Sequence, residues 1–400
     1  MGLILARSPF FVDRNGFDAG ATLKVEMGYV VAGLTITKTY NLNFNESNRL
    51  DISPLVREQI GVVWSEATAG VPSSETRAEF VGVVRTTLSG EIAEVPQSDV
   101  ILSYISTDGY SFYEDGYNAN LIADLEDNAY YAGSNDRIQK LDDSPLIIPF
   151  LIAADADYLS NTDVIEHVIT FYNKGVQVYQ DTNSKNIGLT SPSNFFQVGD
   201  YFKSYKNRVV ADSGTFEDSN CLQDFFDQFQ LQPIDKVLIS AENTSSGDTY
   251  IKELKVETIE ECKHTPDRLI FLNKYGVEED LWFFKKSEKS MSSEKESFRA
   301  STIISYASTS TSKTDLHAYQ DYNINGRESL TLNTGFVHES FYNNFKQLML
   351  SEKVYVYLND KQYPINIKTS ELTEKTHVNE KLINYTIEVE FSYDVINNIV

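Results

Sequence analysis

The sequence comprises 400 residues, of which 41% are hydrophobic and 23% charged, and this composition excludes a wholly disordered chain. Its length favours two or three domains over a single hydrophobic core. Lysine and arginine number 34 against 58 aspartates and glutamates, so the net charge is −24, and it is spread over both halves. Such a charge repels phosphate backbones and anionic lipid headgroups, so we expect neither sequence-specific nucleic-acid binding nor adsorption to membranes.

The cysteine count and the apolar runs indicate a soluble protein made in a reducing compartment. Cys221 and Cys262 are too few for a disulfide-stapled scaffold or a cysteine-based zinc site. The apolar run PLIIPFLIAA at 145–154 is about half the ~20 residues that a membrane helix needs, so no membrane insertion is expected. Arg7 and Pro9 interrupt the apolar start where a signal peptide would continue.

Residues 1–157 are expected to form an N-terminal β-sandwich-like domain. Leu23, Val25 and Met27 alternate with polar residues, as in a strand with one buried face, and further short strands follow. Ser53-Pro54 in RLDISPLVREQIG fits the start of a short helix. Residues 108–145 are rich in Asp, Asn, Gly and Tyr, which is typical of a long excursion from such a sandwich.

Residues 158–300 are expected to form a β-rich middle domain. Its predicted strands are DVIEHVITFYN, GVQVYQ, KVLIS, YIKELKVETI, RLIFLNKYG and EDLWFFKKS. The stretch KKSEKSMSSEKESFRA at 285–300 contains mainly Ser, Lys and Glu, which predicts a solvated strand or a connector to the last module.

Residues 301–400 are expected to form a small α+β module of hairpins and one helix. The clearest strand is LINYTIEVEFSYDV, which places Tyr385, Ile387, Val389, Phe391 and Tyr393 on one face. The sequence predicts two successive hairpins, with turns at 359–361 and 379–381, and Pro364 predicts an edge position for its strand. The chain as a whole is therefore predicted to be mainly β with an α+β part.

The one long helical pattern lies at FVHESFYNNFKQLMLSEK. Phe341, Phe345, Leu348 and Met349 recur at i, i+4, i+7 and i+8, which predicts a buried stripe lying on the apolar face of the hairpins.

The sequence carries no pattern for catalysis, for a cofactor or for a metal site. His167, His264, His317, His338 and His377 do not fall at metal-ligand spacing, and no nucleophile elbow, phosphate loop or dinucleotide fingerprint occurs. An acidic loop with Asp155 and Asp157 lacks the glycine and glutamate of a calcium loop. We therefore expect no enzymatic activity.

The candidate contact residues lie in the 108–145 excursion. They are the five tyrosines Tyr110, Tyr113, Tyr117, Tyr130 and Tyr131. Aromatic faces beside Asp and Asn suit sugar binding, whereas two Asp-Gly turns with tyrosines packed on a neighbour suit a subunit contact. Both interpretations make the excursion an interaction surface, and the sequence leaves the choice between subunit and receptor open.

Five passages of the sequence resemble a known family. They are ARSPFFV at 6–12, RLDISPLVREQI at 49–60, ECKHTPDRLIFLNKYGVEEDLWFFKKSEKS at 261–290, NTGFVHESFYNNFKQLMLSEKVYV at 333–356 and NEKLINYTIEVEFSYD at 379–394. Together they resemble tail or baseplate structural proteins of tailed phages infecting Bacteroidota, including crAss-like phages. The shared motifs are packing and turn motifs, and the 108–145 excursion is not covered.

The resemblance implies a non-enzymatic virion structural protein without a cofactor. Such a protein is made in the host cytoplasm and is one subunit of a tail, tail-ring or baseplate assembly, where it forms a homo-oligomeric ring and contacts other phage tail proteins. The alternatives are a tail protein that binds a host surface glycan as its receptor and a tail enzyme that degrades such glycans.

Overall fold

The computed structural model of the chain is mainly β, which confirms the predicted fold class: 58% of the described residues lie in strands and 9% in helices. The described residues are 2–31, 34–44, 47–59, 82–115, 131, 133–141, 147–151, 164–186, 202–206, 234–243, 249–259, 263–276, 278–306, 309–312, 314–359, 361–374 and 382–396. Within these ranges, every helix is too short or too polar to pass through a bilayer.

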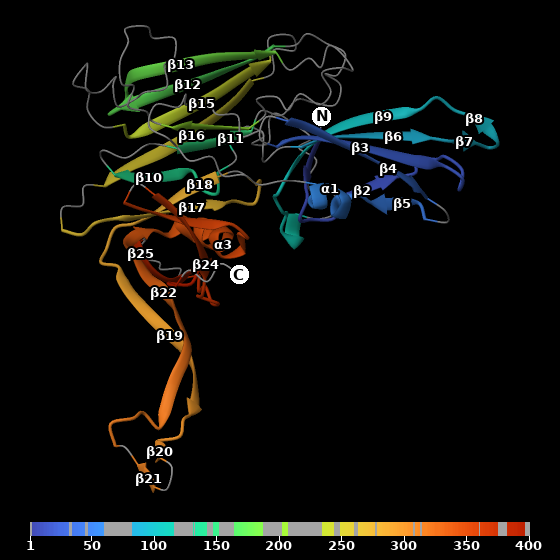
Figure 1. Cartoon of the computed structure of the whole chain (residues 1–400). Coiled ribbons are helices and arrows are strands. Elements are labelled where there is room, and N and C mark those ends of the chain that lie inside the picture. The colour runs from blue at the N-terminus through green and yellow to red at the C-terminus, as the bar shows by residue number, and fades with distance from the viewer. Residues whose placement is uncertain are drawn as a thin grey trace. The chain divides into compact units, whose positions relative to one another are not determined.

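The N-terminal part is built on a five-stranded sheet in the order β1-β9-β6-β3-β4 (Figure 1). Its strands are β1 (Gly2–Leu5), β3 (Thr22–Val31), β4 (Leu34–Asn43), β6 (Gly82–Ser89) and β9 (Val100–Thr107). Three of the four pairings are antiparallel, and only β1 pairs with β9 in parallel. Two small ladders accompany this sheet: β2 (Phe11–Asp13) with β5 (Arg49–Asp51), and β7 (Glu91–Ile92) with β8 (Val95–Pro96).

The alternation predicted for β3 is confirmed, since Leu23, Val25 and Met27 are all buried. They belong to one apolar core with residues from β1, β2, β6 and the helix α1 (Ser53–Gln59). The helix starts at Ser53, as the sequence predicts. Burial of these apolar side chains stabilises the N-terminal part, and the polar side chains on the opposite face of the strands remain in contact with solvent.

A carboxylate fixes the entry into α1. The Asp51 Oδ1 accepts hydrogen bonds from the backbone N of Ser53 at 3.0 Å, from the Ser53 hydroxyl at 2.7 Å and from the backbone N of Phe10 at 3.1 Å. We expect Asp51→Ala to lower the free energy of unfolding by about 1–2 kcal/mol, because these donors lose their acceptor. Asp51→Asn keeps the acceptor oxygen and should cost clearly less; equal losses in urea unfolding would contradict this role.

The middle part contains a second five-stranded sheet in the order β10-β16-β15-β12-β13. The strands are β10 (Arg137–Leu141), β12 (Val164–Asn173), β13 (Val176–Asn186), β15 (Lys236–Asn243) and β16 (Thr249–Ile259), and a separate pair joins β11 (Ile147–Leu151) to β14 (Phe202–Lys206). Strand β10 pairs with β16 in parallel. Residues 137–141 of the 108–145 excursion therefore form an edge strand of this sheet.

A seven-stranded sheet runs in the order β18-β17-β23-β24-β25-β22-β19. Its strands are β17 (Asp267–Leu272), β18 (Glu278–Phe283), β19 (Glu288–Arg299), β22 (Tyr319–His338), β23 (Val354–Leu358), β24 (Lys361–Ile367) and β25 (Leu382–Phe391). The two-residue period of β25 is confirmed, because Tyr385, Ile387, Val389 and Phe391 are buried and the residues between them face solvent or are half-buried. Tyr393 follows the strand and is 42% exposed.

Two details of the C-terminal strands differ from the sequence prediction. Residues 370–374 form no strand, and β24 pairs directly with β25, so the last strands form a meander rather than two hairpins. Strand β24 is also paired on both sides and is not an edge. It accommodates Pro364 because its ladder with β25 begins one residue later, at Ile365. The turn expected at 379–381 lies outside the described residues.

The predicted C-terminal helix is present as a turn of 3₁₀ helix, Glu339–Phe341, followed by α3 (Tyr342–Leu350). Phe341, Phe345 and Leu348 are buried, as predicted, and Met349 is half-buried. The helix is shorter than its sequence pattern because β22 continues to His338.

The chain forms two compact units, each assembled from separate stretches. The first comprises Met1–Glu261, Ile270–Leu281 and Ser340–Glu352, and the second Cys262–Leu269, Trp282–Glu339 and Lys353–Val400. Helix α3 falls in the first unit. Of the expected domain boundaries, residue 157 lies outside the described residues and residue 300 lies just after β19.

Candidate functional site: the β19–β22 arm

The second unit carries a two-stranded ribbon, here called the arm and defined as residues 288–327. Figure 1 shows β19 and the adjoining part of β22 leaving the sheet together and ending at the small hairpin of β20 (Ile303–Tyr306) and β21 (Thr309–Ser312). Every residue of β19 is exposed, and so are the first six residues of β22. The paired strands β19 and the start of β22 therefore have both faces in solvent, and their described residues form no hydrophobic core.

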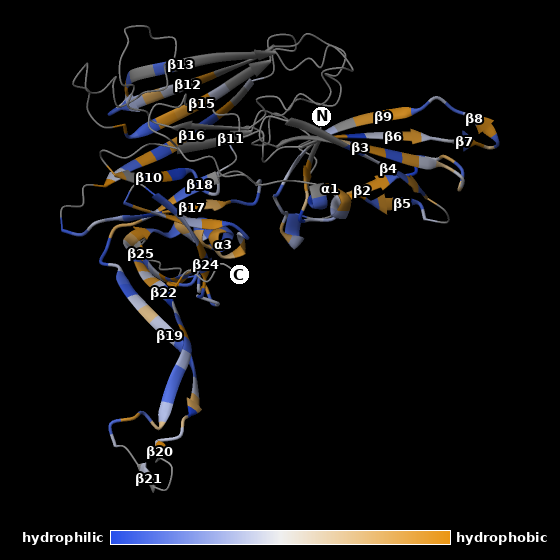
Figure 2. Ribbon diagram, in the orientation of Figure 1, coloured by the Kyte–Doolittle hydropathy of each residue, from blue (hydrophilic) through white to orange (hydrophobic). Residues whose placement is uncertain are grey.

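The composition of β19 explains this exposure. The strand is mostly serine, lysine and glutamate and is drawn mainly in blue and white in Figure 2. Its partner β22 changes character along its length: Leu330 and Leu332 are buried within the sheet, whereas Tyr319 and Tyr322 near its start are exposed. Of the two alternatives that the sequence leaves open for 285–300, a solvated strand or a connector, the structure shows a solvated strand at Glu288–Arg299, although the sequence does not show that this strand extends beyond its sheet.

The root of the arm is hydrogen-bonded to β25 and to the segment that follows it. Arg327 donates to Asp394 Oδ1 at 2.8 Å and to Glu390 Oε1 at 3.3 Å. The side chain of Asn325 donates to Asp394 Oδ2 and to the carbonyl of Ile396, and it accepts from the backbone N of Ile396 at 3.1 Å. These bonds fix the direction in which the arm leaves the sheet, although each exposed ion pair alone contributes little stability.

A β-bulge interrupts the ladder of the arm between Glu294 and Glu296. On the opposite strand, Asn323 has φ 49°, a left-handed conformation that asparagine tolerates better than most residues. Bulges of this kind bend a ribbon and increase its twist, which discourages uncontrolled pairing along an exposed edge.

The three candidate tyrosines that the structure describes differ in exposure. Tyr110 and Tyr131 are buried, with 7% and 6% of their surface exposed, whereas Tyr113 is fully exposed. Tyr117 and Tyr130 lie outside the described residues. Of the three described, Tyr113 alone is available to a partner, so a shared role of the five in a contact stays a prediction.

Tyr110 is enclosed by its own unit. The guanidinium of Arg7 lies 4.8 Å from the centre of its ring, and Phe112 packs edge-on at 5.7 Å. Burial raises the pKa of Tyr110 well above its usual value. The preceding Gly109 allows a close approach, because a Cβ there would lie 2.5 Å from the carbonyl oxygen of Lys274. The Asp108-Gly109 pair, which one of the two interpretations of the sequence made an Asp-Gly turn, is thus packed closely against the backbone at Lys274.

Sequence reasoning also missed a buried carboxylate, Glu279, in the first unit. Only 7% of its surface is exposed, and burial raises its pKa to about 7. It accepts hydrogen bonds from the backbone N and the hydroxyl of Ser134, from the amide of Asn273 at 3.1 Å and from the amide of Asn344 at 2.7 Å. Three segments distant in sequence meet at this side chain, which suits a structural role better than catalysis because solvent does not reach it.

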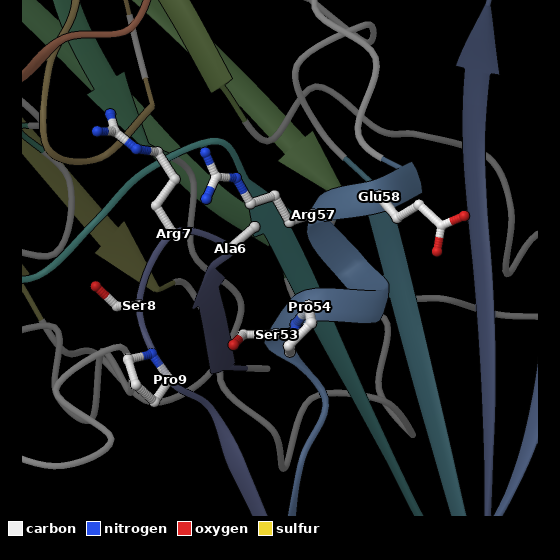
Figure 3. Close-up of a pocket in the computed structure, with 8 residues that line it drawn as sticks. All are labelled: Ala6, Arg7, Ser8, Pro9, Ser53, Pro54, Arg57 and Glu58. Atoms are coloured by element: carbon white, nitrogen blue, oxygen red, sulfur yellow. The ribbon is translucent and has the colours of Figure 1, made fainter.

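A groove of about 420 Å³ lies beside α1, between the N-terminal segment and the helix (Figure 3). Its two cationic side chains, Arg7 and Arg57, both contact Glu352, at 3.3 Å and 2.7 Å, and Arg7 also donates to the carbonyl of Leu350. Both guanidinium groups are thus already paired with Glu352. Among the described lining residues, the groove therefore has no unpaired cation that could bind an anion. Its remaining lining residues are Ala6, Ser8, Pro9, Ser53, Pro54 and Glu58.

Across the residues that the structure describes, no three His, Cys, Asp or Glu side chains lie close enough together to hold a metal ion. Both cysteines, His377, Asp155 and Asp157 lie outside those residues. The arm is therefore the feature with the clearest capacity for interaction. Comparison of the sequence with protein-family models and with curated proteins gives no match.

Proposed function

We propose that the chain is a non-enzymatic structural protein of a phage virion, one subunit of a tail, tail-ring or baseplate assembly. In this proposal it is made in the host cytoplasm, forms a homo-oligomeric ring and contacts other tail proteins. The resemblance of five sequence passages to tail proteins supports the family, and the mainly β fold is compatible with it.

The observation that carries the proposal is the arm. Ordering a ribbon costs conformational entropy, and a ribbon with both faces in water regains little of it by burying its own apolar surface. Proteins usually shorten or cover such edges, because they pair with other chains. If another chain of an assembly covers an arm of this length, the buried surface offsets the entropy cost of ordering the ribbon.

The charge of the chain is consistent with a place along the path of DNA. A net charge of −24 repels a phosphate backbone, so DNA can pass a ring of such subunits without adhering to it. This argument concerns non-specific attraction alone and does not identify the ring.

A receptor-binding tail protein is the second candidate, and one observation favours it. Tyr113 is fully exposed in a 3₁₀ turn (η2, Tyr113–Asp115) beside Glu114 and Asp115, and an aromatic face next to carboxylates suits the recognition of a sugar.

Particles produced without this chain separate the two candidates. The structural proposal expects incomplete or missing tails by electron microscopy, restored when the chain is supplied from a plasmid. Complete particles that fail to adsorb to host cells would instead support the receptor-binding candidate. Complete and infectious particles would contradict both.

A further inference from the structure

We propose that the arm binds a second copy of this chain through one of its two faces, the face that carries Phe298 and Tyr322. The setting of this inference, an assembly of many copies, rests on the proposed function. The choice of face and partner comes from the geometry and charge of the arm.

The ladder register assigns side chains to the two faces. Glu296 lies opposite Tyr322 and Phe298 opposite Gln320, so these four share one face, here called the aromatic face. Ser297 lies opposite Asp321 and Arg299 opposite Tyr319, and these four form the reverse face.

The aromatic face is an ordered apolar surface. The rings of Phe298 and Tyr322 meet edge to face with centroids 5.7 Å apart, and each residue remains 48% exposed. The hydroxyl of Tyr322 is hydrogen-bonded to the carboxylate of Glu296, which also raises the pKa of the tyrosine. Two aromatic rings already held in place lose little conformational entropy on binding, which is what favours Tyr and Phe at protein interfaces.

The reverse face is less suited to a dry contact. Lys295 pairs with Asp321 at 2.7 Å, and Arg299 lies exposed beside Tyr319. Covering these charges removes them from water, and the loss of hydration offsets much of what the contact gains. We therefore assign the contact to the aromatic face.

The charge of the arm points to a second copy as the partner. Residues 288–327 contain five lysines and arginines and five aspartates and glutamates, so the arm is neutral within a chain of charge −24. Copies of so acidic a chain repel one another, and a contact through a neutral segment meets the least of this repulsion. Apolar side chains are also frequent there: Met291, Phe298, Ile303, Leu316, Tyr319, Tyr322 and Ile324 are 40–68% exposed.

The hydrogen bonds at the root of the arm orient it before binding. The bonds of Asn325 and Arg327 to the segment after β25 hold the ribbon in one direction before any partner arrives. A preordered element pays less entropy on association than a flexible one, so a modest aromatic surface suffices for specific binding.

The test compares two double variants of the full chain by sedimentation velocity over a concentration series. In the first, Phe298→Ser with Tyr322→Ser removes the aromatic face; in the second, Arg299→Ser with Tyr319→Ser changes the reverse face by the same number of residues. All four residues are exposed, so both variants should keep the melting temperature of the wild type. We expect the aromatic-face variant to weaken self-association at least about tenfold, and the reverse-face variant to stay within about twofold of wild type.

Two results would overturn the inference. One is a wild-type chain that stays monomeric up to about 100 μM, a range in which even micromolar contacts are populated. The other is an equal loss of self-association in both variants, which would remove the distinction between the faces. Neither result decides whether the chain is a virion protein, because that part of the proposed function is tested by its presence in particles. Conversely, arm-dependent association of a chain that is absent from particles would sustain the inference and reject the proposed function.

Discussion

Replacing Glu279 by alanine is expected to lower the free energy of unfolding by about 3–5 kcal/mol, measured by urea unfolding near pH 5. The variant leaves four donors without an acceptor: the half-buried backbone N and hydroxyl of Ser134 and the buried amides of Asn273 and Asn344. Glu288→Ala is the matched control, because that carboxylate is exposed and pairs with Lys286 at the surface. Its expected effect is within about 0.5 kcal/mol.

The cost of losing Glu279 should depend on pH in a defined direction. Burial raises the pKa of this carboxyl from 4.5 to about 7, so the folded state holds the proton more tightly than the unfolded state. The stabilising contribution of Glu279 is therefore full below pH 4.5 and falls as the pH rises to about 7. Relative to Glu279→Gln, which does not titrate, the wild type should lose up to about 3 kcal/mol across this window. A constant difference across the window would show that the carboxyl is solvated.

The second large effect is expected for Phe345→Ala in α3. Its side chain is fully buried in the stripe formed with Phe341 and Leu348, so truncation removes apolar contacts and leaves a cavity. We expect a loss of about 3–5 kcal/mol in the free energy of unfolding.

Phe336 provides the control for Phe345. It is the same residue type nine positions earlier in the chain, but 74% of its surface is exposed. Phe336→Ala should change the free energy of unfolding by no more than about 0.5 kcal/mol. Similar melting temperatures for the Phe345 variant and the wild type would mean that the stripe does not face a core.

The parts of the fold that the sequence predicted correctly are those governed by local periodicity. The alternation of Leu23, Val25 and Met27 and the four buried positions of β25 follow from the two-residue repeat of a strand. The stripe of α3 follows in the same way from the helical repeat, and the start of α1 follows from the Ser53-Pro54 pair, although the hydroxyl of Ser53 donates to Asp51 instead of capping the helix.

The sequence failed where the outcome depends on pairing between distant segments. Pro364 predicts an edge strand locally, but the start of the β25 ladder one residue later allows a central position. The arm is another example, because the sequence of a polar strand has the same pattern whether the strand lies within a sheet or extends beyond it.

The candidate site was harder to predict for the same reason. Tyr110 and Tyr131 lie in a segment whose composition is typical of a contact surface, yet both are buried. Arg7 and Phe112 pack against Tyr110, and the hydroxyl of Tyr131 donates to the carbonyl of Asn135. Glu279 and Asp280 both precede the buried residues Leu281 to Phe284, so the local sequence does not single out Glu279, and its donors come from segments that no local pattern connects to it.

Locating the chain in purified phage particles tests the central claim most directly. Mass spectrometry of particles purified by density gradient reports whether the chain is present, and gold-labelled antibody against a tag at the N-terminus reports its position. The proposed function predicts a fixed number of copies per particle and label on the tail, in a ring or at the baseplate. Absence of the chain from infectious particles, with the protein found only in the lysate, would contradict it.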